Sequence, residues 1–84
     1  MMKISVELSL YPLDDQFLPI IQDIVERLMG DKRVEAIVNT MSTQIFGDFE
    51  SVMAVVNETI EYSFKTYGKQ VFVAKFLNSD VKPD

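Results

Sequence analysis

The fold is decided by the central segment 34–48, which reads Val-Glu-Ala-Ile-Val-Asn-Thr-Met-Ser-Thr-Gln-Ile-Phe-Gly-Asp. Apolar and polar residues alternate over Val34–Asn39, which predicts a half-buried strand. We expect a second strand over Met41–Phe46, ended by Gly47, so that the two form a hairpin. Its hydroxyl and amide side chains then lie on a sheet and offer a candidate ligand surface, although Thr and Ser also occur on sheets for propensity alone.

A strand and a helix are expected before this hairpin. Four apolar residues alternate with polar ones from Ile4 to Tyr11, which predicts a half-buried strand stopped by Pro12. Asp14 and Asp15 are candidate N-caps for the helix that follows. Apolar residues then recur at helical spacing as far as Gly30, which we expect to end that helix.

A helix and a strand are expected after the hairpin. Asp48 is the candidate cap of a helix over Phe49–Tyr67, ended by Gly68. The β-branched and aromatic run Gln70–Leu77 predicts a fourth strand. The polar tail 78–84 is expected to fray.

The predicted order is therefore strand, helix, strand, strand, helix, strand. Two right-handed crossovers around a central hairpin give an α+β, ferredoxin-like βαββαβ fold. Its four-stranded antiparallel sheet has the strand order 4-1-3-2, with both helices on one face. The other face is left open, and we expect function or assembly to use it.

Length and composition narrow the possible functions. The 84 residues make one domain, 1–84, which is small enough that self-association is a common source of extra stability. The chain has no Cys and no His, which removes thiolate catalysis, cysteine metal sites and the Ser-His-Asp triad. A net charge of −5 argues against nucleic-acid binding. Because no apolar run reaches membrane length and no signal peptide is seen, we expect a cytoplasmic protein that does not associate with membranes.

The facing of the strands follows from their period of two. The open face receives polar residues mixed with apolar ones: Ser5, Glu7, Ser9, Tyr11, Glu35, Ile37, Asn39, Val71, Val73 and Lys75. In the third strand Met41, Thr43 and Ile45 are the favoured core set, which leaves Ser42, Gln44 and Phe46 open; a bulge would reverse this. An open face this apolar predicts a homodimer or homotetramer formed through it.

Two interpretations of the open face remain at this point. In one it is only an assembly surface, and Glu7 and Lys75, on neighbouring strands, form a weak cross-strand ion pair. In the other a small-molecule pocket lies at or beside the interface, and Glu7 pairs with an amine or a protonated pyrimidine. The candidate ligand-binding residues are Glu7, Ser9, Tyr11, Asn39, Ser42, Thr43, Gln44, Phe46 and Lys75. No catalytic residue and no metal ligand is predicted.

Two stretches carry a resemblance to a known family. The opening Glu7-Leu8-Ser9-Leu10-Tyr11-Pro12-Leu13 and the hairpin Met41-Ser42-Thr43-Gln44-Ile45-Phe46-Gly47-Asp48 resemble the YkoF-like family of thiamine/hydroxymethylpyrimidine-binding proteins. Together with the strand Val71–Leu77, the resemblance covers about residues 3–79. This chain departs from the single-unit members at Phe46, where relatives often have a glutamate.

The resemblance implies a ferredoxin-like fold and a non-catalytic role in binding thiamine or its hydroxymethylpyrimidine moiety, in vitamin salvage or transport. It implies no cofactor other than that ligand. Family members carry two such units in one chain or associate as single units. With Phe46 in place of the glutamate, Glu7 is the carboxylate left to meet the ligand, and a related heterocycle is an alternative to thiamine. The other alternative is a structural or regulatory oligomerisation module that binds no such ligand.

Overall fold

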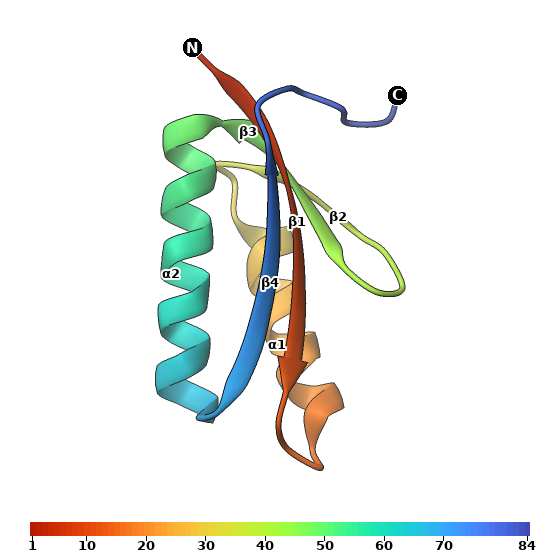
Figure 1. The fold of residues 1–84 in the computed structure, drawn as a ribbon, viewed down its shortest axis with the longest axis vertical. Coiled ribbons are helices and arrows are strands. Elements are labelled where there is room, and N and C mark those ends of the chain that lie inside the picture. The colour runs from red at the N-terminus through yellow and green to blue at the C-terminus, as the bar shows by residue number, and fades with distance from the viewer.

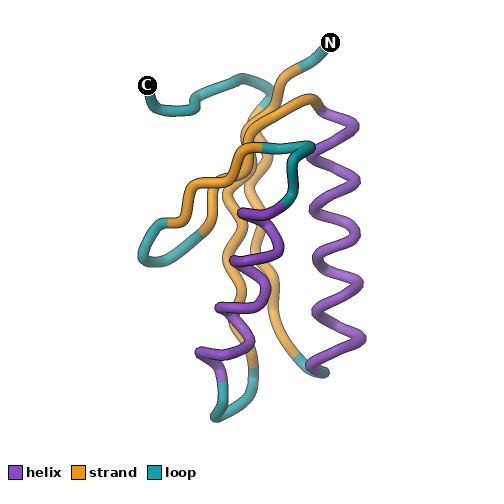
Figure 2. Tube along the Cα trace, turned by 180° about the vertical axis from the view of Figure 1, so that it is seen from behind, coloured by secondary structure: helices purple, strands orange, loops and turns teal.

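The computed structural model describes all 84 residues and confirms the predicted order of elements. The elements are β1 (Lys3–Pro12), α1 (Phe17–Gly30), β2 (Glu35–Val38), β3 (Thr43–Asp48), α2 (Phe49–Tyr67) and β4 (Gln70–Leu77). The antiparallel sheet has the order β2-β3-β1-β4, and both helices lie on one side of it (Figures 1 and 2). The ferredoxin-like fold is therefore confirmed.

The core forms between this sheet and the two helices. Ile4, Val6 and Leu8 of β1 are at most 4% exposed and pack with apolar residues of both helices. The helix residues in this cluster are Ile24, Leu28, Val52, Val55 and Val56. Burying one such side chain contributes about 1.5–3 kcal/mol, so β1 supplies a large part of the driving force.

The third strand faces as favoured, but its bounds differ at both ends, since β3 begins at Thr43 and continues past Gly47 to Asp48. Thr43 and Ile45 are buried on the helix side, opposite Leu8 and Val6. Met41 was expected to join them, and that prediction was wrong, because β3 begins only at Thr43. The Asn39 backbone N–H donates to the Ser42 carbonyl at 2.8 Å, which closes a turn with Met41 at its tip, 82% exposed.

The predicted helix caps also need correction. α1 begins at Phe17 after Gln16, and the Asp14 carboxylate accepts the Gln16 backbone N–H at 2.7 Å, one turn before the helix. Asp48 does stand at the N-cap of α2, but its carboxylate makes no cap bond and instead pairs with Lys3 at 2.9 Å. Gly68 ends α2 with φ +83°, a conformation that favours glycine.

The strands next to β1 differ in length, and this leaves part of β1 paired on one side only. β4 pairs with β1 from Ser5 to Pro12, whereas β3 pairs with it only as far as Leu8, opposite Thr43. Beyond that point the β2–β3 hairpin diverges and β1 and β4 continue without it (Figure 1). The strand pairing therefore ends at Leu8, and beyond it the Ser9 hydroxyl donates to the Met41 carbonyl at the hairpin tip at 3.3 Å.

The C-terminal tail does not fray as expected. The Ser5 hydroxyl donates to the Ser79 carbonyl at 2.7 Å and accepts the Val81 backbone N–H at 3.1 Å, while Lys82 pairs with Glu35. These bonds carry the tail across the open face at the end where β1 begins. Phe46, opposite Ser5 on that face, is only 3% exposed, so the tail covers it.

We expect Ser5→Ala to release the tail. The substitution removes the hydroxyl that holds both Ser79 and Val81, and should cost about 1 kcal/mol of unfolding free energy. Heteronuclear NOE values for residues 79–82 should fall toward those of a free terminus. Ser9→Ala is the matched control on the same strand, and unchanged tail order in Ser5→Ala would contradict the assignment.

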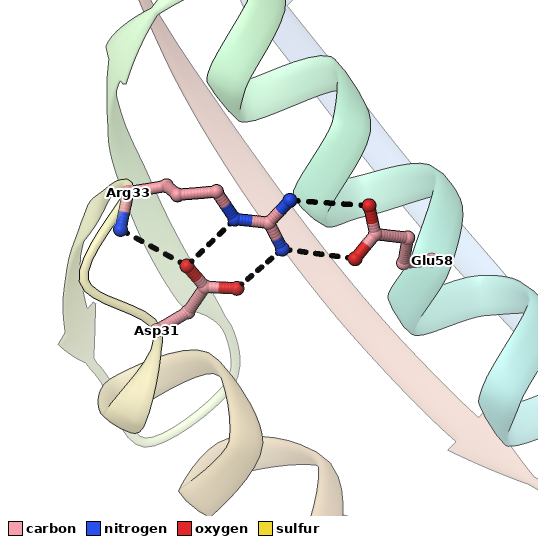
Figure 3. A network of polar contacts seen from close by, with 3 residues as sticks. All are labelled: Asp31, Arg33 and Glu58. Carbon is pink, nitrogen blue, oxygen red and sulfur yellow. Dashed lines mark hydrogen bonds and ion pairs between the residues drawn. The ribbon is translucent and has the colours of Figure 1, made fainter.

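A three-residue ion-pair cluster joins the loop after α1 to the middle of α2 (Figure 3). The Arg33 guanidinium donates to both carboxylate oxygens of Asp31, at 3.0 and 2.7 Å, and to both oxygens of Glu58, at 3.1 and 2.9 Å. Hydrogen bonding to Arg33 lowers the pKa of Asp31 and the pKa of Glu58. Planar, two-pronged contacts of this kind are the stronger form of ion pair.

This cluster should make stability fall in acid. Because both carboxyl pKa values are lowered in the folded state, the contribution is present above their ordinary values of 3.8 and 4.5 and is lost as pH falls below them. We expect Arg33→Gln to reduce the loss of stability between pH 6 and pH 3, as measured by urea denaturation. Lys32→Gln, the neighbouring cation, is the control and should keep the full acid dependence.

Candidate ligand-binding site

A hollow lies on the open face of the sheet, beside the hairpin tip. Its volume is about 310 Å³. β1 supplies Glu7, Ser9 and Tyr11, since alternate residues of a strand point to the same face. The other lining residues come from the hairpin and from β4, namely Met41, Ser42, Val73 and Lys75. The structure thus brings together five of the predicted site residues.

Glu7 is the chemical centre of this hollow. It lies directly opposite Lys75 on one side and Gln44 on the other. The Lys75 ammonium is 3.5 Å from one carboxylate oxygen, and the Ser42 hydroxyl donates to the other at 3.0 Å. Both side chains of the ion pair are open to solvent, with exposures of 41% for Glu7 and 78% for Lys75. The carboxylate is therefore held in position but stays accessible.

A second cavity lies on the helix side of the sheet, beneath the same hairpin tip. Its volume is about 410 Å³, and its walls come from α1, β1 and the hairpin. Eleven of the sixteen lining residues are hydrophobic and none is charged. Sequence reasoning missed this cavity, because the helix residues that line it, such as Ile21 and Val25, have the spacing of ordinary core residues. No local pattern shows that α1 leaves the space under the turn unfilled.

Comparison with known proteins gives the family. The model of a family described as "Thiamine-binding protein" matches residues 6–79. The chain belongs to the thiamine-binding protein family. The matched range includes most of β1 and all of α1, the hairpin and β4, which are the elements that line the two hollows. The family resemblance inferred from the two motifs is confirmed.

Solved structures share the fold of this thiamine-binding family member. A Streptococcus pneumoniae protein is 21% identical with a TM-score of 0.85, over 95% of this chain and 90% of the other. A Thermotoga maritima protein, provisionally assigned to thiamine biosynthesis or salvage, is 20% identical with a TM-score of 0.78, over 88% and 81%. A hypothetical protein of Methanocaldococcus jannascii is 19% identical with a TM-score of 0.79, over 99% and 87%. No curated protein matches the chain in sequence.

Four of the predicted site residues do not line the open-face hollow: Asn39, Thr43, Gln44 and Phe46. The Asn39 side-chain amide donates to the side-chain oxygen (Oε1) of Gln44 at 3.1 Å, so these two residues brace the hairpin. Thr43 is buried on the helix side, where it lines the apolar cavity instead. Phe46 is covered by the tail and does not line either hollow.

The structure shows no cluster of metal-ligating side chains and no helix able to cross a membrane. No three His, Cys, Asp or Glu side chains lie together in a group that could hold a metal ion. Neither helix combines the length and the apolar character needed to cross a bilayer. The site chemistry therefore consists of one carboxylate, one ammonium group, hydroxyls and apolar walls.

Proposed function

We propose that this chain is a non-catalytic binding protein for thiamine or its hydroxymethylpyrimidine moiety, serving vitamin salvage or transport. The single observation that carries the proposal is the Glu7 carboxylate. It is anchored by Ser42 and still exposed, in the open-face hollow of a thiamine-binding family member. A carboxylate beside an aromatic ring, here that of Tyr11, favours the binding of a cationic heterocycle.

The neighbours of Glu7 support this use. Tyr11 is half exposed at the edge of the hollow and offers a ring for stacking. The ion pair with Lys75 is long and solvated, so displacing the ammonium by a ligand costs less than about 1 kcal/mol. The hydroxyls of Ser9 and Ser42 supply donors and acceptors at the rim.

The proposed assembly is a homodimer or homotetramer through the open face, with the ligand at or beside the interface. Tyr11, Val71 and Val73 lie together on that face and are 46–50% exposed. A stable interface buries about 800 Å² per partner, a large share of a sheet this size. Because the tail covers the end of the face near Ser5, the contact would centre on the other end, where the hollow lies.

The exposed Val71 and Val73 favour a second candidate function. A structural or regulatory oligomerisation module would bury both residues whether or not a ligand is bound. In that case the polar hairpin would only set the register of the contact. Ligand binding, and not assembly, separates the two candidates.

We expect Glu7→Gln to lower affinity for thiamine by about ten- to a hundred-fold, measured by calorimetry. The substitution keeps the shape and one acceptor but removes a charge-assisted contact worth roughly 1.5–3 kcal/mol. Glu35→Gln is the matched control, since Glu35 lies on the same face but outside the hollow. Parent-like affinity in Glu7→Gln together with a weakened oligomer would assign Glu7 to the interface instead.

We expect light scattering at micromolar concentration to show a dimer or a tetramer. Val71→Asp should shift the mass toward the monomer, because it places an unpaired charge in the proposed interface. Met53→Asp introduces the same charge at an exposed residue of α2 and should leave the mass unchanged. A monomeric parent protein would overturn the proposed assembly but not the ligand.

A further inference from the structure

Apolar side chains lie at both ends of the open face, with a mostly polar row between them. At the end where β1 begins, the strand register places four residues in one row across the sheet: Glu35, Phe46, Ser5 and Leu77. The next row holds Ile37, Gln44, Glu7 and Lys75. At the far end Tyr11 and Val71 stand opposite each other, and both are about half exposed. Phe46 belongs to this surface by its place in β3, yet only 3% of it is exposed.

The tail, residues 78–84, is what withdraws Phe46 from the open face. It leaves the end of β4 and runs toward the side of the sheet where β2 lies (Figure 1). The Ser5 hydroxyl on β1 holds it by two hydrogen bonds, and Lys82 pairs with Glu35 on β2. Because β3 lies between β1 and β2, the tail passes over the Phe46 ring between its two points of attachment.

The tail is attached by few contacts and buries little of itself. Every residue from 78 to 84 is exposed, including Val81, which is 53% exposed. The ion pair of Lys82 with Glu35 lies at the surface, with side-chain exposures of 36% and 68%, and such pairs contribute little to stability. The tail can therefore leave without unfolding the sheet, and its release would return the Phe46 ring to the open face.

A second copy of this chain needs the surface that the tail occupies. A stable interface buries about 800 Å² per partner. Four strands spaced about 4.8 Å apart, each eight residues long at about 3.3 Å per residue, offer a flat area of only about 500 Å². The row that the tail covers is thus taken from an area that is already limited.

We propose that the tail is an autoinhibitory strap, which competes with a second copy of this chain for the open face. With the strap bound, two copies meet through the end that carries Tyr11 and Val71. With the strap released, Phe46 joins the contact beside Leu77, and self-association becomes stronger. The inference rests on the proposed assembly through the open face and is independent of the proposed ligand.

Two substitutions in the tail test the strap without changing the open face. Val81→Pro removes the backbone N–H that donates to Ser5, and Lys82→Glu places a second carboxylate beside Glu35. In the full chain carrying both, heteronuclear NOE values for residues 79, 80 and 82 should fall toward those of a free terminus. Analytical ultracentrifugation should show self-association tighter by about tenfold, the combined effect of one hydrogen bond and one surface ion pair.

Two further variants serve as controls. Lys65→Glu makes the same charge reversal on α2, where Lys65 pairs with Glu61, and should leave the dissociation constant unchanged. Glu35→Lys combined with Lys82→Glu reinstates the ion pair with its charges exchanged. This double variant should keep the tail ordered and return the constant toward the parent value.

The outcomes separate failure of the strap from failure of the proposed assembly. If the parent associates and the released tail leaves its dissociation constant unchanged, the strap is overturned and the assembly stands. Weaker association after release would also overturn it, because the tail would then be part of the interface. A tail that stays ordered in the variant carrying Val81→Pro and Lys82→Glu would show that these bonds do not hold it, which overturns the strap as well. If parent and variant are both monomeric with the tail released, the proposed assembly fails and the strap with it.

Discussion

The structure depends on the pairing of β1 with a strand on each side. Its register places Ile4, Val6 and Leu8 over the helices, and the same register places Glu7 between Gln44 and Lys75 on the bare face. Core and site are thus alternate residues of one strand. A slip of one residue would exchange the two sets, burying a carboxylate and exposing the apolar side chains. The hydrophobic burial that stabilises the fold is therefore also what positions the site.

Because β3 and β4 pair with β1 over unequal lengths, the turn that borders the site is held by few bonds. β4 follows β1 to Pro12, while β3 pairs only as far as Leu8. The turn between β2 and β3 consequently has few bonds to the rest of the sheet. Ser42 to Glu7, Ser9 to the Met41 carbonyl, and the contact between Asn39 and Gln44 are the ones that fix it. The polar residues concentrated in this segment serve the geometry of the turn before they serve any ligand.

The features that the sequence could predict were those that follow from a fixed residue period. Alternation along β1 and β4 predicted the order of the strands, their facing, and the contact of Glu7 with Lys75, because strand period and topology together determine neighbours. The tail was predicted wrongly, since its bonds join Ser5 to residues more than seventy positions away. The apolar cavity was missed for a related reason. Its existence depends on how far α1 stands from the hairpin, and residue types at helical spacing do not encode that distance.

Both ends of the chain lie at the same end of the molecule, as Figure 1 shows, away from the residues Tyr11 and Val71 that close the other end of the sheet. A second copy joined to the C-terminus through a short connector would therefore begin near the place where the first copy began. If such a fold is duplicated within one gene, the connector between the two copies does not have to cross the binding surface of either copy. The two copies could then diverge independently, one keeping its carboxylate and the other acquiring a different preference, while the shared arrangement of strands stays unchanged.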